Sequence, residues 1–280
     1  MHKHIRLVDE KRKIVQVTTT DERWYVRESK DPVTGLPSHK FVPSVTWICD
    51  HYPKGVGFYK WLANKGWDEA EAIKEAAGGR GSKVHQAVAD LLDGLVVEME
   101  AQYINPNTGL GEPLTLEEYE AILSFVSWFK LTHPKVLGRE MVVWNDQEEY
   151  AGTVDFLCEI DKELWLIDFK TSKSVYPSHE MQVSAYKHAV PNWSKAKLGI
   201  LQLGYARMKA GYKFTLVEDQ FDLFLASKKI WAKETAGQSP KQKDYPLSVV
   251  LVESNVEAAA AATTAPVRPS TVAAAHTNGG

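Results

Sequence analysis

Two apolar segments joined by three polar residues constrain the fold of this chain most. The segments are residues 152–157 and 164–170, and Asp161-Lys162-Glu163 between them is typical of a tight turn. The apolar run from Trp165 to Ile167 indicates a central strand. The sequence therefore predicts a buried β-hairpin at this point.

Three charged side chains lie on the hairpin: Asp155 on its first strand, and Asp168 and Lys170 on its second. Because side chains alternate along a strand, Asp168 and Lys170 share one face, while Ile167 and Phe169 point into the opposite layer. Asp is uncommon in strands and an unpaired buried charge is costly, so these groups need partners. Either the pair lies on a solvated face, or a cation binds there.

A divalent cation suits two carboxylates, because Mg²⁺ and Mn²⁺ prefer carboxylate, carbonyl and water oxygens. A bound ion lowers the pKa of a water molecule and withdraws charge from a phosphoryl oxygen. The ammonium of Lys170 is then placed to position that water or to stabilise the transition state. The pattern favours metal-dependent hydrolysis of a phosphodiester.

Five short motifs around these residues resemble one known family. In chain order they are Pro43-Ser44-Val45-Thr46, Gly81-Ser82-Lys83-Val84-His85, Gly152-Thr153-Val154-Asp155, Asp168-Phe169-Lys170 and Gln182-Val183-Ser184-Ala185-Tyr186. Their order and spacing resemble the RecB-like exonuclease branch of the PD-(D/E)XK nuclease superfamily, which includes phage exonucleases and mitochondrial genome maintenance exonuclease. The resemblance spans residues 41–205.

The resemblance implies a role for each matching residue. Asp155 and Asp168 would be metal ligands, the main-chain carbonyl of Phe169 would join them, and Lys170 would be the catalytic lysine. His85 would be a further ligand through a neutral imidazole nitrogen, which suits Mn²⁺ and is tolerable for Mg²⁺. The expected cofactor is therefore Mg²⁺ or Mn²⁺.

His85 also has an interpretation that does not depend on the resemblance. Ser82 has the residue type of a helix N-cap, and the helix that follows carries an apolar stripe through Val84, Val88 and Leu92. His85 lies beside that stripe, so a hydrogen-bonded core histidine is the alternative to a metal ligand.

Glu140 is a candidate for a further acidic group. It lies on a strand-like run from Val136 to Trp144, fifteen positions before Asp155. In the family that the chain resembles, a glutamate from a neighbouring element helps to hold the metal-bound water or a second ion. Glu148 and Glu149 are alternatives for that role.

Gln182 and Tyr186 lie four residues apart on a helix expected at residues 179–189, so both project from one face. Their amide and phenol are placed to meet the strand backbone or a phosphate beside the metal. The alternative is a helix packed through Met181 and Val183, with Gln182 exposed.

The net charge of −3 hides a gradient along the chain. Residues 170–245 contain thirteen Lys and Arg against six Asp and Glu, whereas residues 90–120 contain eight acidic residues and no basic one. A nuclease needs positive potential only along its groove, and solvated surface is the alternative role for such cations. The candidate phosphate contacts are Lys173, Lys187, Lys195, Lys197, Arg207, Lys209 and Lys213.

An aromatic-rich stretch precedes the His85 helix. Its members are Trp47, Tyr52, Phe58, Tyr59, Trp61 and Trp67. Exposed rings of this kind stack on unpaired bases. We expect most of them to be buried in the helical layer instead.

Cysteine content and hydropathy exclude several classes of protein. Cys49 and Cys158 are the only cysteines among the 280 residues, which excludes both a disulfide framework and a four-cysteine iron–sulfur cluster. This departs from RecB-like relatives that carry such a cluster. No apolar run is long enough to cross a membrane and the polar start is no secretory signal, so a cytoplasmic location is expected.

The expected fold is α/β, with a restriction-endonuclease-like core and an N-terminal helical extension. Residues 1–40 are polar, with a hairpin or loop at 31–35, and residues 41–133 are mainly helical, with one helix at 116–131. The core at 134–245 contains the three strands named above, the Gln182 helix, strands at 198–206 and 212–217, and a helix at 221–234. Residues 255–280 form a disordered tail rich in Ala, Thr and Pro.

The expected function is metal-dependent exonuclease cleavage of DNA in replication, recombination or repair, as in phage-encoded relatives. Single- or double-stranded DNA ends would be the substrate, and a recombination or single-strand-binding protein would be a partner. Two alternatives are a structure-specific endonuclease on the same fold and a non-catalytic nucleic-acid-binding protein on a decayed one. Decay usually removes an acid or the lysine, whereas Asp155, Asp168 and Lys170 are all present.

Overall fold

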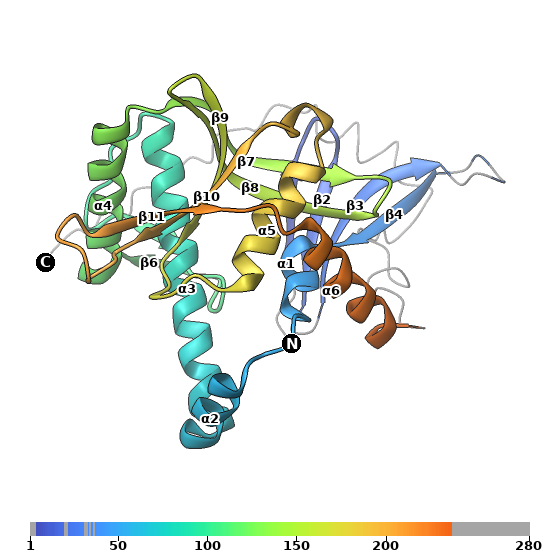
Figure 1. The fold of residues 1–280 in the computed structure, drawn as a ribbon, viewed down its shortest axis with the longest axis horizontal. Helices are drawn as coiled ribbons and strands as arrows, with labels where there is room; N and C mark the ends of the chain where they lie inside the picture. Colours follow the sequence, from blue (N-terminus) through green and yellow to red (C-terminus); the bar gives the residue numbers. More distant parts are fainter. Residues whose placement is uncertain (1–3, 20–21, 31–32, 34, 36, 237–280) are drawn as a thin grey trace, which may run out of the picture. The chain divides into compact units, whose positions relative to one another are not determined.

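The computed structural model describes residues 4–19, 22–30, 33, 35 and 37–236, all within a compact unit that spans residues 1–240 (Figure 1). In these residues, eleven strands form three sheets, accompanied by six α-helices and one short 3-10 helix. This confirms a mixed α/β fold. No helix in the described part of the chain has both the length and the apolar character that crossing a membrane requires.

A five-stranded sheet forms the centre of the unit, in the order β11-β10-β9-β8-β7. Neighbouring strands are antiparallel except β9 and β10, which are parallel and are joined through helix α5. All five strands and both later helices were predicted. Their bounds are β7 (Lys135–Asn145), β8 (Tyr150–Ile160), β9 (Glu163–Lys170), β10 (Lys197–Leu203), β11 (Tyr212–Val217), α5 (Pro177–His188) and α6 (Phe221–Glu234), with the 3-10 helix at Pro191–Trp193.

The turn between β8 and β9 confirms the predicted hairpin. Ile160 pairs with Glu163, so the turn consists of Asp161 and Lys162 alone. Both residues have positive φ, 53° and 66°, which is the conformation of a type I′ turn. Glu163 was predicted to belong to the turn and instead begins β9.

Helices cover both faces of the central sheet. One face packs against α1 (Val45–Asp50), α5 and α6, and the other against α3 (Trp67–Leu92) and α4 (Leu116–Thr132) (Figure 1). Leu166 contributes to the first core, whereas Ile167 and Phe169 contribute to the second. The alternation predicted for this strand is therefore confirmed, with an apolar layer on each side.

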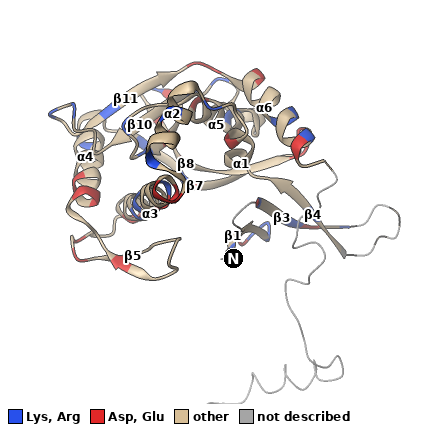
Figure 2. Cartoon of the chain, turned by 90° about the horizontal axis from the view of Figure 1, so that it is seen from below, with Lys and Arg blue, Asp and Glu red and all other residues tan. Residues whose placement is uncertain are grey.

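The N-terminal segment contains four strands that the sequence analysis did not predict. They form an antiparallel sheet in the order β1-β2-β3-β4, with bounds His4–Asp9, Ile14–Thr18, Arg23–Lys30 and Pro37–Pro43. Figure 2 shows this sheet as a separate layer beside β7 and β8, and Ile14, Tyr25 and Val42 pack there against Val142 and Trp144. β3 and β4 pair across the expected hairpin, although residues 31, 32 and 34 lie outside the described residues. The expected tail at 255–280 also lies outside them.

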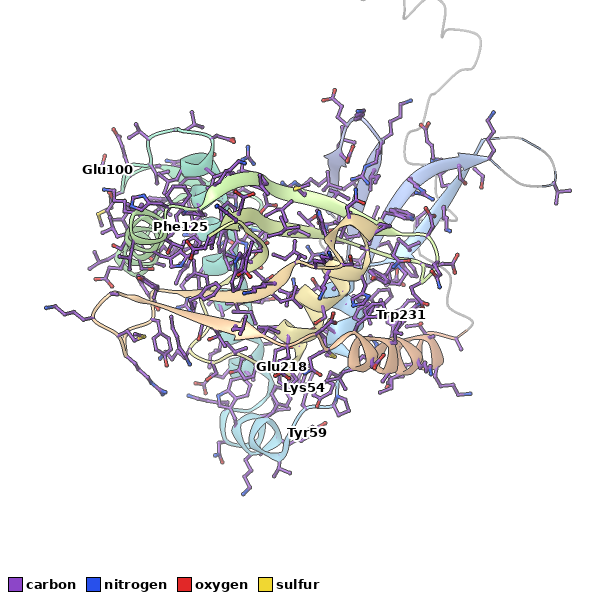
Figure 3. All side chains as sticks on the ribbon, turned by 45° about the horizontal axis from the view of Figure 1, so that its top comes forward. Lys54, Tyr59, Glu100, Phe125, Glu218 and Trp231 are labelled. Atoms are coloured by element: carbon purple, nitrogen blue, oxygen red, sulfur yellow. The ribbon has the colours of Figure 1, made fainter. Side chains whose placement is uncertain are left out.

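Three tryptophans join this first sheet to the opposite end of the chain. Trp24 on β3, Trp47 on α1 and Trp231 on α6 meet with ring centroids 5.0 to 6.0 Å apart, each pair edge to face. Figure 3 labels Trp231 on α6. Edge-to-face contacts add to the free energy gained by burying the rings. The first sheet is therefore attached to the helical layer through aromatic packing.

The region from 41 to 133 is mainly helical, as predicted, with two differences. It contains α1, α2 (Val56–Lys65), α3 and α4, but also a small hairpin of β5 (Gln102–Ile104) and β6 (Gly111–Pro113) that was not predicted. The His85 helix was predicted to begin at Ser82, which is wrong, because α3 begins at Trp67 and Ser82 lies inside it.

Close packing explains Gly79, one of the glycines in the middle of α3. A Cβ on Gly79 would lie 2.9 Å from Asn105 Oδ1, which belongs to the loop beyond β5. A Cβ on Gly81 would lie 3.5 Å from Thr171 Oγ1, just after β9. Gly79 therefore allows the loop to approach the helix, and neither glycine ends it.

The β8–β9 turn generates a prediction about stability. Lys162→Gly is expected to raise the free energy of unfolding by about 1 kcal/mol, because an L residue is strained at positive φ and glycine is not. Glu159→Gly, three residues earlier in β8, is the control and should lower it by about 0.5 to 1 kcal/mol. Urea unfolding of the full chain measures both. A loss of stability in Lys162→Gly would contradict the turn geometry.

Candidate metal centre

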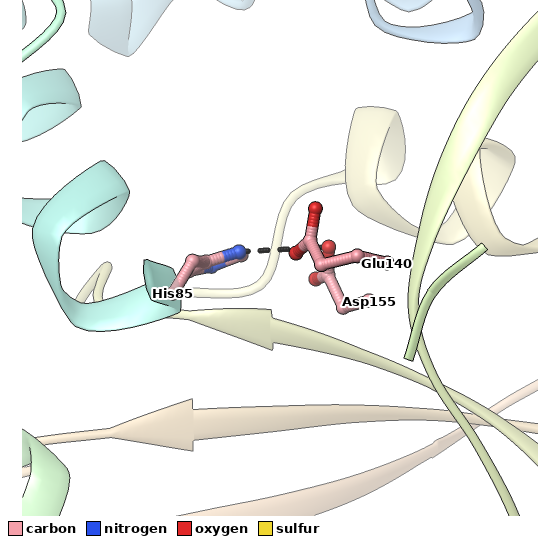
Figure 4. A group of neighbouring side chains, drawn as sticks. All are labelled: His85, Glu140 and Asp155. Atoms are coloured by element: carbon pink, nitrogen blue, oxygen red, sulfur yellow. Dashed lines mark ion pairs between the residues drawn. The ribbon is translucent and has the colours of Figure 1, made fainter. Parts of the chain in front are cut away.

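Three predicted site residues converge beside the central sheet. Figure 4 shows His85 from α3, Glu140 from β7 and Asp155 from β8 pointing toward one another. One potential ligand atom from each lies within 4.8 Å of the others. Glu148 and Glu149, the alternatives to Glu140, do not belong to this group.

Those two alternative glutamates are paired with lysines elsewhere. Glu148 Oε2 lies 3.2 Å from Lys228 Nζ, and Glu149 Oε1 lies 3.2 Å from Lys40 Nζ. Of the three candidates named from the sequence, the structure therefore brings Glu140 to Asp155 and His85.

An unusual backbone conformation aims Glu140 at the group. The register of β7 and β8 places it opposite Asp155, and its φ is 46°, in the left-handed region. Such a conformation costs about 1 kcal/mol or more in a residue other than glycine, and it is often found at functional sites. Burial raises the pKa of Glu140, and the nearby charge of Asp155 adds to this rise.

Asp155 connects the group to strand β9. Its Oδ2 accepts a hydrogen bond of 2.8 Å from the main-chain N–H of Phe169, and its Oδ1 lies 3.5 Å from His85 Nδ1. Burial opposes ionisation, but the charges of His85 and Lys170 and the Phe169 N–H outweigh it, so the pKa of Asp155 is lowered. The carboxylate is therefore ionised at neutral pH.

His85 lies between Asp155 and the carbonyl of Phe169. Its Nε2 is 2.9 Å from that carbonyl oxygen, which the sequence analysis named as a further ligand. Burial lowers its pKa, but Asp155 and then Glu140 raise it more strongly, to about 9. A cation bound among these residues would replace the proton that the carboxylates hold on the imidazole.

Asp168 is paired with Lys170 and does not belong to the three-residue group. Its side chain is 1% exposed, and its Oδ2 lies 2.5 Å from Lys170 Nζ. Burial raises its pKa to about 6, although the Lys170 charge acts against the rise. The pKa of Lys170 is also raised, because Asp168 and Asp155 outweigh the effect of its own burial, so Lys170 is a cation at neutral pH.

Gln182 and Tyr186, the predicted pair on α5, hold Lys170 in place. Lys170 Nζ lies 3.2 Å from Gln182 Oε1, to which it donates, and Gln182 Nε2 donates to Tyr186 Oη at 2.7 Å. The two α5 residues project from one face, as predicted. Tyr186 is 3% exposed, so it supports the lysine through Gln182 and is not placed to contact a phosphate.

The ring of Tyr186 also explains why position 152 is a glycine. A Cβ on Gly152 would lie 2.4 Å from Tyr186 Cε1 and 3.3 Å from Val45 Cγ2, both of which are buried. Two of the five motifs therefore depend on one contact, because the ring that supports Gln182 occupies the space above Gly152.

The predicted basic track divides between the two ends of the sheet. Lys187 lies 3.2 Å from Asp219, beyond the end of β11, and Lys197 is paired with Glu163 at the start of β9. Because β9 and β10 are parallel, this is the end opposite Lys170. Lys187 was predicted to bind nucleic acid near the site, and its position away from the site and its ion pair argue against that role.

Lys195, two residues before β10, lies at that same opposite end, whereas the other four cations lie at the end of the sheet where Lys170 is. Lys173 is exposed and follows β9, and Figure 2 shows Lys and Arg positions, coloured blue, on the turn that joins β10 to β11. That turn and the start of β11 carry Arg207, Lys209 and Lys213, all exposed. The usable part of the predicted track is therefore this second set.

Sequence reasoning missed a contribution from the first sheet. Tyr25 Oη lies 2.9 Å from Thr153 Oγ1, next to Gly152, and Gln16 Nε2 donates to the same phenol at 2.8 Å. The charge of Arg6 on β1 also acts on Glu140. No motif marks these residues, because their proximity depends on strands that were not predicted.

The residues fit a divalent cation. An imidazole and two carboxylates gather in one place, and the carbonyl of Phe169 lies beside them. Oδ1 of Asp168 is buried and has no hydrogen-bond partner in the described part of the chain, which is costly unless something else binds it. Oxygen ligands with one nitrogen suit Mn²⁺, and Mg²⁺ also binds carboxylates.

Comparison with known proteins adds no identification. No family model matches the sequence, and a search of curated proteins returns no match. The function of the site is therefore inferred from its geometry and chemistry.

The contact between Gly152 and Tyr186 generates a second prediction. Gly152→Ala should lower the free energy of unfolding by about 1 to 3 kcal/mol, because the buried ring cannot yield without disturbing the core. Gly78→Ala is the control: nothing lies within 4 Å of its added Cβ, and a gain of about 0.5 to 1 kcal/mol is expected in a helix. Thermal and urea unfolding measure both changes.

A double-mutant cycle tests whether the contact itself is responsible. In a Tyr186→Ala background, Gly152→Ala should cost clearly less than in the original protein, since the obstructing ring is gone. Equal costs in the two backgrounds would contradict the explanation.

Proposed function

We propose that this chain is a divalent-metal-dependent nuclease with a PD-(D/E)XK, restriction-endonuclease-like core that hydrolyses phosphodiester bonds in DNA. The observation that carries the proposal is the position of Lys170. It is a cation, 18% exposed, held between Asp168 and Gln182, next to a separate cluster of an imidazole and two carboxylates. A five-stranded mixed sheet with helices on both faces supports the proposed core.

His85, Glu140 and Asp155 would hold the metal, joined by Asp168 and the carbonyl of Phe169. A bound Mg²⁺ or Mn²⁺ would supply an activated water and polarise a phosphoryl oxygen. Glu140, whose pKa is raised, is the group best suited to accept a proton from an attacking water.

Lys170 would stabilise negative charge that develops on the phosphoryl oxygens. Its raised pKa keeps it positive at neutral pH, and the hydrogen bond to Gln182 limits its rotation. A charged donor fixed before the reaction costs no reorganisation when the charge develops. The exposed cations Lys173, Arg207, Lys209 and Lys213 would hold the DNA backbone at the same end of the sheet.

Cleavage from a DNA end is the form of activity that we propose, as in the family that the sequence resembles. A structure-specific endonuclease on the same core is the alternative, and a decayed, non-catalytic fold is disfavoured because the acids and the lysine are all in place. End-labelled linear DNA compared with closed circular DNA separates the first two, since an exonuclease spares the circle.

Substitution of Lys170 tests the catalytic assignment. Lys170→Ala is expected to reduce the rate of cleavage of end-labelled DNA in Mg²⁺ by roughly 10²- to 10³-fold, the usual cost of losing one transition-state donor. Lys173→Ala removes an exposed lysine three residues away and should change the rate far less. Undiminished cleavage by Lys170→Ala would exclude the proposed role.

Titration calorimetry with Mn²⁺ tests the metal ligands directly. Asp155→Asn and Glu140→Gln should each weaken Mn²⁺ binding by roughly tenfold or more, because a neutral amide replaces an anionic ligand of similar shape. Glu148→Gln, outside the cluster and paired with Lys228, is the matched control and should bind normally. If the original protein binds no Mn²⁺, the decayed, non-catalytic alternative is favoured.

A further inference from the structure

Helix α2 lies on the surface, although its sequence is rich in aromatic residues. None of its residues is buried, and it packs mainly against α3. Phe58 is 40% exposed and Tyr59 58%, while Trp67, at the start of α3, is 70% exposed. Burial was expected for most rings of this stretch, and for these three that expectation is wrong.

The rings form a patch. The centroid of Phe58 lies 5.6 Å from that of Tyr59 and 5.8 Å from that of Trp61. Large apolar side chains that gather in this way on a surface mark sites of interaction. We call Phe58, Tyr59, Trp61 and Trp67 the α2 aromatic surface.

Positive charge accompanies these rings. Residues 53–65 contain Lys54, Lys60 and Lys65 and no acidic residue. Lys65 is paired with Glu69 at 2.6 Å, whereas Lys54 and Lys60 form no ion pair within the part of the chain that the structure describes. Figure 3 labels Lys54, which precedes α2 by two residues, and Tyr59, which lies on it.

Helix α3 carries both Trp67 of the α2 aromatic surface and His85 of the candidate metal centre. Lys54 and Lys170 are both close enough to the partly buried His179 for their charges to add to the lowering of its pKa by burial. His85 lies eighteen residues after Trp67 on the same helix, roughly 27 Å along its axis at the usual helical rise. A flexible polymer of modest length would span that distance.

We infer that the α2 aromatic surface binds single-stranded nucleic acid and leads it to the metal centre. Phe58, Tyr59 and Trp67 would stack on unpaired bases, while Lys54 and Lys60 would contact phosphates. This inference rests on the proposed nuclease function and names its substrate as an unpaired strand. Rings next to lysines match a chain of anionic phosphates with exposed base faces.

A second copy of the protein fits the surface less well. In a two-fold symmetric contact the same patch meets itself, so Lys54 and Lys60 would approach their own counterparts. Like charges placed together across an interface oppose association. A base within a duplex is also excluded, because its faces are covered by its neighbours in the stack.

Fluorescence anisotropy with labelled oligothymidylate, in the absence of divalent cations, tests the inference on the full chain. Tyr59→Ala and Trp67→Ala should each weaken binding by roughly five- to 150-fold, the range reported for loss of one stacking ring. Tyr59→Phe, which keeps the ring, should bind as the original protein does. Leu131→Ala on α4 removes a similarly exposed apolar side chain, 73% exposed, and should have no effect.

The proposed phosphate contacts of Lys54 and Lys60 are tested by the salt dependence of binding. Lys60→Ala should weaken binding and reduce the slope of log K against log salt by about 0.7, the value for one phosphate contact to a single strand. Binding of a blunt duplex should change little when the rings are removed, because paired bases cannot stack on them. An equal loss for duplex and single strand would overturn the inference, as would unchanged binding in both ring variants.

Two further measurements separate this inference from the proposed function. Hydrolysis of bis(p-nitrophenyl) phosphate with Mn²⁺ requires the metal centre but no base, so the ring variants should retain it. If the protein binds single strands through α2 but hydrolyses no substrate, the proposed nuclease function is contradicted and the role of the α2 aromatic surface is not. If the protein hydrolyses its substrates but the ring variants bind single strands as tightly as the original protein, the role of the α2 aromatic surface is contradicted and the nuclease function is not. A dimer in sedimentation that Tyr59→Ala converts to a monomer would show a self-association surface and overturn the inference.

Discussion

The rest of the candidate site depends on the burial of Asp168. Its carboxylate is 1% exposed, in the centre of the sheet, where a lone charge would be strongly unfavourable. Lys170 lies against it, and Gln182 and Tyr186 hold Lys170 in turn. Two more carboxylates, Glu140 and Asp155, lie nearby with His85 as their positive partner. The arrangement of α3, α5 and the sheet can be understood as the means of balancing this collection of acids.

The part of the fold that sequence predicted best is the part where local and long-range preferences agree. β8, β9 and the turn between them follow from apolar runs bounded by a polar tripeptide, and α5 and α6 follow from helical spacing. In the same region Lys170 lies beside Asp168, and Gln182 and Tyr186 project from one face of α5, as the spacing of these residues predicted. Strand alternation was sufficient to place the aspartate beside the lysine.

What sequence could not predict depends on contacts between distant segments. The first sheet has polar strands whose buried residues, such as Ile14 and Tyr25, face β7 and β8, and no local pattern identifies that surface. The start of α3 was misplaced because Ser82 has the residue type of an N-cap, whereas in the structure it lies inside a helix that begins at Trp67. The division of the basic track likewise follows from strand direction, which charge counts along a sequence do not contain.

The tryptophan cluster has a consequence for the order in which the protein is made. Trp24 and Trp47 leave the ribosome early, but Trp231 follows almost two hundred residues later. Until α6 has been synthesised, Trp24 and Trp47 lack the ring of Trp231 as a neighbour. A nascent chain therefore carries an incomplete aromatic pocket for most of its synthesis, and only the last described helix closes it.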